Sequence, residues 1–115
     1  MPTFEQGDVI KVPFPYTDRP TRQSRPALVV STGKIEELHG LLWVVMITSA
    51  QNGAWPKDVP VSNLKQAGLP SPSVVRVVKI ATIEALDASK IGSLTASQLN
   101  EVIQLIRGEL DWPLR

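Results

Sequence analysis

Short apolar runs separated by prolines recur along the chain and predict a series of β-strands. In the first run, Ile10, Val12 and Phe14 share one face. The next two runs are uninterrupted and rich in β-branched residues, which is typical of strands buried on both faces. Pro60 limits the fourth run to a brief or edge strand, because proline donates no amide proton. The predicted strands cover residues 9–14, 27–31, 41–48, 59–61 and 73–83.

The C-terminal part of the chain shows a helical pattern instead. Thr95 and Gln98 have the spacing of a capping box, in which each side chain hydrogen-bonds to the backbone of the other. Single helical turns are expected at residues 35–39, before Gly40, and at residues 62–67, which Gly68 would close in a left-handed conformation. The helix that follows the box has one apolar stripe, made of Leu99, Val102, Ile103, Ile106 and Leu110.

Many strands and one long helix predict a mainly β fold, with a small, strongly bent sheet or barrel and the C-terminal helix packed against it. The chain has 115 residues, so we expect one domain over residues 1–115. Ten prolines mark strand ends and loops rather than a linker, and no repeat is visible.

Composition removes several kinds of chemistry. The chain has no cysteine and a single histidine, His39, which excludes disulfides, thiolate metal sites and paired-histidine catalysis. Its aspartates are scattered, so we expect no metal or other cofactor. The net charge of +1 argues against a general polyanion binder. The longest apolar run, residues 41–47, is too short to cross a bilayer, and no signal pattern begins the chain. We therefore expect a cytoplasmic protein that contacts no membrane.

The connection between the first two predicted strands is longer than a hairpin needs. It contains Arg19 and Arg22, and Arg25 follows at its exit, so that three guanidinium groups recur at a spacing of three residues. Such groups bind phosphates bidentately. A solvated loop whose arginines only keep it soluble explains the same composition, and both interpretations stay open.

Two residues stand at the ends of predicted strands. Arg25 precedes Pro26 at the junction of loop and strand, which holds its backbone as oriented electrostatic catalysis requires. Thr48 ends the strand over residues 41–48 and places a hydroxyl there. A hydroxyl in that position also serves as a cap or turn former, so the residues alone leave its role open.

Several motifs occur together in a fixed order. They are Gly7-Asp-Val-Ile-Lys-Val-Pro-Phe-Pro15, Arg25-Pro-Ala-Leu-Val-Val-Ser31, Val45-Met-Ile-Thr-Ser49, Trp55-Pro-Lys-Asp-Val-Pro60, Ser73-Val-Val-Arg76 and Ile91-Gly-Ser-Leu94. With these motifs the chain resembles the MazF/PemK family of toxin–antitoxin ribonucleases over about residues 7–110.

The resemblance implies an SH3-like β-barrel of the CcdB/PemK type, assembled as a homodimer. It implies ribosome-independent, metal-independent endoribonuclease activity on single-stranded mRNA at a short sequence, which leaves 2′,3′-cyclic phosphate and 5′-hydroxyl ends. It also implies a cognate antitoxin that neutralises the toxin, with operator DNA bound only through that antitoxin. The implied catalytic pair is Arg25 and Thr48. RNA supplies its own 2′-hydroxyl nucleophile, which suits a chain without cysteine or paired histidines.

Single-strand binding needs cations and aromatic faces. We expect an RNA-binding set of Tyr16, Asp18, Arg19, Arg22, Ser49, Gln51, Arg76 and Lys79. Arg76 has an alternative as the solvent-facing residue of its strand, and Trp43 is expected in the core or at the dimer interface. Many relatives have Gln-Ile-Arg-Thr where this chain has Lys79-Ile-Ala-Thr82, so RNA specificity differs or Lys79 replaces the arginine.

Two other functions fit the same fold. A CcdB-like toxin poisons DNA gyrase through a C-terminal Trp-Gly-Ile ending, whereas this chain ends Asp111-Trp-Pro-Leu-Arg115. A non-catalytic SH3-like nucleic-acid-binding module is the other alternative. Because Arg25 and Thr48 are both present, the ribonuclease is favoured.

Overall fold

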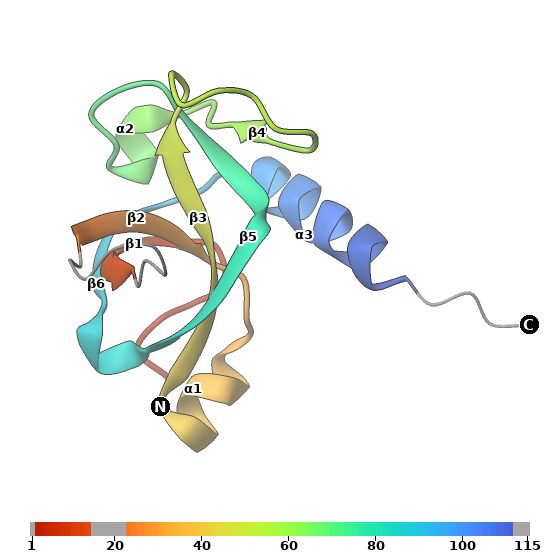
Figure 1. The fold of residues 1–115 in the computed structure, drawn as a ribbon. Coiled ribbons are helices and arrows are strands. Elements are labelled where there is room, and N and C mark those ends of the chain that lie inside the picture. Colours follow the sequence, from red (N-terminus) through yellow and green to blue (C-terminus); the bar gives the residue numbers. More distant parts are fainter. Residues whose placement is uncertain (1, 15–22, 112–115) are drawn as a thin grey trace, which may run out of the picture.

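A computed structural model describes residues 2–14 and 23–111 of the chain (Figure 1). Its strands pair into one antiparallel sheet of six, in the order β4-β5-β3-β2-β1-β6, which confirms the mainly β prediction. The sheet curls into a partly closed barrel with the C-terminal helix α3 beside β5 (Figure 1). The strands are β1 (Asp8–Phe14), β2 (Gln23–Val29), β3 (Leu41–Ser49), β4 (Val59–Pro60), β5 (Ser73–Glu84) and β6 (Ser89–Ser93).

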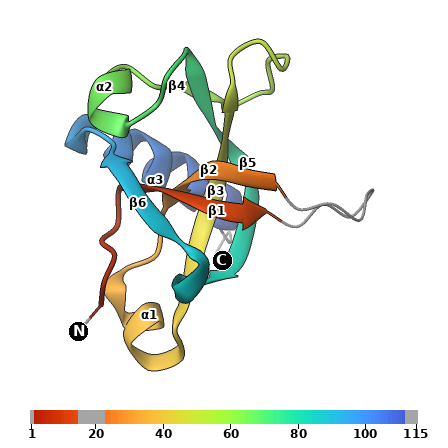
Figure 2. The same ribbon diagram turned by 90° about the vertical axis from the view of Figure 1, so that its left-hand side faces the viewer.

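In the described part of the chain, three α-helices and one 3-10 helix connect and cover the strands. They are α1 (Gly33–His39), α2 (Leu64–Ala67), the 3-10 helix η1 (Ala85–Asp87) and α3 (Ala96–Leu110). The turned view looks onto β6, β1 and β2, with α1 near the N-terminus and α3 behind the strands (Figure 2). Gly40 and Gly68 end α1 and α2 in the left-handed conformation, at φ 68° and 73°, as their spacing predicted.

Both faces of the central strands are buried, because consecutive residues of a strand point to opposite sides. Val45 and Ile47 of β3 belong to the cluster that packs against α3, whereas Val44 and Met46 belong to the cluster on the other face. This confirms the prediction that the uninterrupted runs are buried on both sides. Trp43 is the exception, because it is 48% exposed. Of the two positions expected for it, the core is wrong, and the dimer interface stays a prediction.

Two strands differ from the sequence prediction. β2 begins at Gln23 rather than Ala27, since Pro26 pairs with Lys11 and the antiparallel ladder continues to the pair of Phe14 and Gln23. Arg25 therefore lies within a strand and not at a loop–strand junction. β6 was not predicted, because its only large apolar residue is Ile91.

The capping box of α3 is half formed. Thr95 caps the helix, and its hydroxyl accepts a hydrogen bond from the Gln98 amide at 3.3 Å. The Gln98 side chain does not return to the cap. It donates to the Pro60 carbonyl at 2.6 Å and accepts from the Ser62 amide at 2.8 Å, so it ties the start of α3 to the end of β4 and to the residues that follow it.

Gly92 allows α2 to lie directly against β6. A Cβ atom at this position would come within 2.3 Å of the Ala67 backbone, which no larger residue could accept without a shift. This close approach brings the segment after α2, residues 68–71, beside the ends of the central strands. That segment forms one wall of the pocket described next.

Candidate nucleic-acid site

A pocket of about 270 Å³ opens where β1, β2, β3 and the start of β5 meet the segment after α2. Polar side chains and backbone line it together with apolar residues. The side chains with chemistry to offer are Lys11, Arg25, Thr48, Ser49, Ser71 and Ser73. The Ser73 hydroxyl donates its proton to the Ser71 carbonyl at 2.8 Å. The two cations and the other three hydroxyls around one opening favour an anionic ligand, since both kinds of group can donate hydrogen bonds to phosphate oxygens.

The pairing of β2 with β3 explains why Arg25 and Thr48 share this pocket. Ala27 lies opposite Met46 in the antiparallel ladder. This pair ends the ladder, and Arg25 and Thr48 each lie two residues beyond it on the two neighbouring strands, where both line the pocket. The sequence separates them widely, whereas the sheet places them on neighbouring strands. Arg25 lies opposite Val12 on its other side, within the β1–β2 ladder.

The Thr48 side chain is buried at 6% exposure, and its hydroxyl accepts a hydrogen bond from Nδ2 of Asn52 at 2.8 Å. The next hydroxyl, of Ser49, accepts from the Gln51 backbone amide at 3.2 Å. Gln51 itself is exposed in the loop after β3 and does not line the pocket. Thr48 and Ser49 are thus brought to the site with Arg25, and Gln51 is not.

Lys11 is a site residue that the sequence reasoning missed. It lies opposite Pro26 in the β1–β2 ladder, next to Arg25, and its exposed side chain lines the pocket. The alternation of β1 contained the signal, because a lysine between Ile10 and Val12 must face away from the apolar side. Which edge of the barrel it faces depends on strand pairing, which one sequence does not provide.

Arg76 lies outside the pocket lining and is buried, at 5% exposure, so the alternative that it is solvent-facing is wrong. Its Nη2 donates to Asp58 Oδ2 at 3.0 Å and to the Gly53 carbonyl at 2.9 Å, and its Nε donates to Asp58 Oδ1 at 3.3 Å. The Trp55 ring covers the guanidinium at 4.2 Å. We call this group, Arg76 with Asp58, the Gly53 carbonyl and Trp55, the clasp.

Two opposing influences set the pKa of the clasp carboxylate. Burial raises the pKa of Asp58, but hydrogen bonds from Arg76 and from the Trp55 amide, together with the arginine charge, lower it further than burial raises it. The net pKa of Asp58 lies below its ordinary value, and the carboxylate is ionised at neutral pH.

The other predicted RNA contacts fall into two groups. Lys79 is exposed on β5, with its ammonium 5.8 Å from the centre of the Trp55 ring, so it lies near the clasp and outside the pocket. RNA contacts by Lys79 and Arg76 stay predictions. Four further residues lie outside the described residues, namely Tyr16, Asp18, Arg19 and Arg22.

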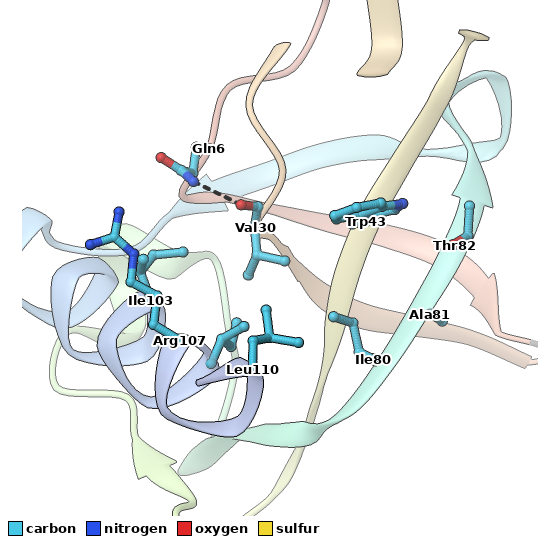
Figure 3. Close-up of a pocket in the computed structure, with 10 residues that line it drawn as sticks. Gln6, Val30, Trp43, Ile80, Ala81, Thr82, Ile103, Arg107 and Leu110 are labelled. Carbon is cyan, nitrogen blue, oxygen red and sulfur yellow. Dashed lines mark hydrogen bonds between the residues drawn. The ribbon is translucent and has the colours of Figure 1, made fainter. Parts of the chain in front are cut away.

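A second, apolar hollow of about 560 Å³ lies between β3, β5 and α3, and Trp43 and Ile80 face Leu110 across it (Figure 3). Within residues 2–14 and 23–111, no three metal-ligating side chains gather in one place. No helix in the described part of the chain has the length and apolarity needed to span a membrane.

The curled antiparallel sheet with its C-terminal helix is similar in fold to solved MazF structures. The family model described as PemK-like, MazF-like toxin of type II toxin–antitoxin system matches residues 5–109. The chain belongs to this family, which confirms the resemblance inferred from its motifs. No curated protein matches it.

Several solved structures share the fold. MazF in the MazE–MazF complex of Deinococcus radiodurans has a TM-score of 0.74 and 20% identity, over 92% of this chain and 94% of that one. The toxin MazF-mt6 of Mycobacterium tuberculosis has a TM-score of 0.69 and 28% identity, over 91% and 99%. An endoribonuclease in complex with its cognate antitoxin, from a mycobacterial species, has a TM-score of 0.71 and 18% identity, over 98% and 100%.

Proposed function

We propose that this toxin is an endoribonuclease that cleaves single-stranded mRNA at the pocket of Lys11, Arg25 and Thr48. The observation that carries the proposal is the convergence of Arg25 and Thr48, from neighbouring strands, on one pocket with a second cation beside them. Family membership supports it, as does the endoribonuclease that shares the fold.

The chemistry that suits this pocket is transfer within the RNA. The 2′-hydroxyl gives up its proton to the solvent as its oxygen attacks the adjacent phosphorus, the bond from phosphorus to the 5′-oxygen breaks, and the leaving oxygen takes up a proton from the solvent. The products are a 2′,3′-cyclic phosphate and a 5′-hydroxyl, and no metal ion takes part. The Arg25 fork binds the phosphate oxygens and stabilises the charge that grows on them. Because arginine has a pKa above ~12, Arg25 acts through its charge and not as a base.

Thr48 and Lys11 have smaller parts. The Thr48 hydroxyl donates a hydrogen bond to a phosphate oxygen, which orients the phosphate relative to the attacking 2′-hydroxyl. The Lys11 side chain is exposed at the rim, where it attracts a neighbouring phosphate of the strand. Binding of RNA by the remaining predicted residues, including Tyr16, Asp18, Arg19 and Arg22, belongs to this proposal.

The test is cleavage of a long single-stranded RNA by the purified protein in excess EDTA, followed by mapping of the RNA ends. We expect discrete cuts with cyclic-phosphate ends, which disappear in Arg25→Ala while the fold is retained. Uncut RNA under every condition would contradict the proposal. Cleavage only with added Mg²⁺ would contradict the metal-independent route, and inhibition of DNA gyrase without RNA cleavage would select the CcdB-like alternative.

A second copy of the chain is the occupant we propose for the apolar hollow between β3, β5 and α3. Large apolar side chains surround it, and Trp43, Ile80 and Leu110 are exposed by 48%, 55% and 75%. Exposed apolar groups gathered in this way mark interaction surfaces. Arg107 lines this hollow and Glu109 lines the adjoining one, so the surface carries charges of both signs, which a self-complementary two-fold interface can pair.

Light scattering tests the dimer. We expect the wild-type protein to be a dimer and Ile80→Asp to be a monomer. Leu86→Asp is the matched control, since Leu86 is 96% exposed on η1 and lines neither hollow. A monomeric wild type, or loss of the dimer in the control alone, would contradict this interface. The other proposed partner is a cognate antitoxin, through which alone the toxin would contact operator DNA.

A further inference from the structure

The loop between β3 and β4, residues 50–58, reaches the proposed site through one side chain. Nδ2 of Asn52 donates a hydrogen bond to the Thr48 hydroxyl at 2.8 Å. The Asn52 backbone amide donates to the Ser49 carbonyl at 3.0 Å, which closes the turn that follows β3. A threonine hydroxyl has one proton to donate and two lone pairs to accept with. Since Asn52 occupies a lone pair, the Thr48 proton stays available to an acceptor in the pocket.

The clasp holds the same loop from the side of the sheet. Nη2 of Arg76 donates to the Gly53 carbonyl at 2.9 Å, and Gly53 directly follows Asn52. The same nitrogen donates to Asp58 at 3.0 Å, close to the point where the loop enters β4. One buried guanidinium therefore fixes both the middle and the end of the loop.

The buried Arg76–Asp58 ion pair fixes the conformation of the loop more than it stabilises the fold. Both side chains of the Arg76–Asp58 pair are less than a tenth exposed. Removing two charges from water costs about as much as their attraction returns, so a buried pair stabilises a fold no better than apolar residues would. A planar guanidinium with several donors in fixed directions does hold a backbone carbonyl and a carboxylate in one arrangement.

We propose that Asn52 is a positioning residue for the Thr48 hydroxyl and that the clasp keeps Asn52 in place. This inference rests on the proposed RNA cleavage at the pocket. Arg76 then acts on the reaction through the loop, by holding the peptide next to Asn52. If the Thr48 hydroxyl loses its orientation, the rate of the chemical step falls, whereas the affinity for RNA changes little.

A double-mutant cycle between Asn52 and Thr48 tests the coupling. We expect Asn52→Ala to lower kcat about 3- to 10-fold, the range for loss of one hydrogen bond, with KM within about twofold of wild type. In the Thr48→Val background the same change should alter kcat by less than about twofold. Asn100→Ala is the matched control, an exposed asparagine of α3 outside the pocket lining. Equal losses in both backgrounds, or none in either, would overturn the proposal.

Two further variants test the direction of the hydrogen bond and the clasp. Asn52→Asp can only accept, so it should turn the Thr48 proton away from the pocket and reduce kcat more than Asn52→Ala does. Arg76→Lys keeps the charge but loses the fork, and kcat should fall with KM nearly unchanged and circular dichroism retained. Wild-type kcat in folded Arg76→Lys would show that the clasp does not act on the site.

A measurement on the protein alone separates this inference from the proposed function. We expect the side-chain amide resonances of Asn52 to move in the NMR spectrum of Thr48→Val, while those of Asn100 stay in place. Unchanged Asn52 resonances would overturn the positioning role, even in a protein that cleaves RNA. A wild-type protein that cleaves no RNA, but whose Asn52 resonances move, would instead contradict the proposed function.

Discussion

Arg25 and Arg76 both lie in strands and were both predicted to contact RNA, yet they occupy opposite environments. Arg25 is partly exposed at a pocket lined by hydroxyls, whereas Arg76 is buried against Asp58 and a backbone carbonyl. An arginine of a strand can therefore line a pocket or be packed within the fold, and its surroundings decide which. Around Arg76 they include the carboxylate of Asp58, from a loop 18 residues earlier in the chain. We therefore expect substitutions at Arg25 to reduce activity mainly, and disruption of the Arg76 clasp to reduce stability mainly.

The largest expected effect is on stability and belongs to the clasp. Asp58→Ala removes the carboxylate and leaves the Arg76 charge buried, which should lower the free energy of unfolding by about 3–5 kcal/mol. Arg25→Ala should change it by less than about 1 kcal/mol, because Arg25 is only partly buried at the pocket. Urea unfolding at one fixed protein concentration measures both. Equal destabilisation by the two variants would remove the distinction between the arginines.

The next effect is on activity and belongs to Arg25. Loss of one well-oriented electrostatic donor lowers a rate by about 10²–10³, or roughly 3–4 kcal/mol of barrier, so Arg25→Ala should lose that much of kcat/KM. Arg25→Lys should recover only part of it, since an ammonium lacks the bidentate fork. Initial rates on a short RNA that contains one mapped cut measure this. An Arg25→Ala rate close to wild type would exclude Arg25 from the reaction.

Acid should weaken the clasp. The folded-state pKa of Asp58 lies below its ordinary value, so the unfolded chain binds more protons and stability rises with pH. The contribution is complete above the unfolded pKa of about 4 and is lost as the pH falls through the folded-state value. Unfolding curves between pH 7 and pH 3 measure it. Asp58→Asn should lose less stability on acidification than wild type. The pKa of Glu36 is also lowered, but both proteins contain Glu36, so its contribution cancels in the comparison. Equal losses of stability in the two proteins would show that another carboxylate is responsible.

The smallest effect concerns Lys11 at the rim of the pocket. Lys11→Ala should weaken RNA binding and reduce the slope of log K against log salt by about 0.7, the value for one contact with a single-stranded phosphate. Lys34→Ala is the matched control, an exposed lysine on α1. Fluorescence anisotropy with a non-cleavable oligonucleotide at several salt concentrations measures both slopes. Equal slopes for the two variants would place Lys11 outside the RNA path.

Local pattern was enough to predict most of the fold. β-branched runs specify strands, and left-handed glycines end the short helices, because both signals act within a few residues. β6 could not be predicted, because its one large apolar residue, Ile91, is followed by a glycine rather than by an alternating apolar pattern. Gly92 is needed there for the close contact with α2. The position of the Gln98 side chain could not be predicted either, because its hydrogen-bond partners, Pro60 and Ser62, are distant in sequence.

The residues of the candidate site also divide into those that local patterns and motifs predict and those that depend on the tertiary structure. Arg25 and Thr48 could be proposed from strand ends and family motifs, and the β2–β3 register then brought them to one pocket. Lys11 and Asn52 could not, because the first depends on the curl of the sheet and the second on a turn after β3. The exposure of Trp43 was also beyond local pattern, since an apolar run does not tell which face meets the core.

The central claim is that RNA binds and is cut at the pocket that joins Arg25 to Thr48. The most direct measurement is NMR titration with an oligonucleotide that contains the mapped cut site and a 2′-deoxy nucleotide at the cleaved position, so that it binds without reacting. We predict that the largest chemical-shift changes fall on Lys11, Arg25, Thr48 and Ser49, with smaller changes at the clasp. Shifts centred on Arg76 and Trp55, with the pocket unchanged, would contradict the account.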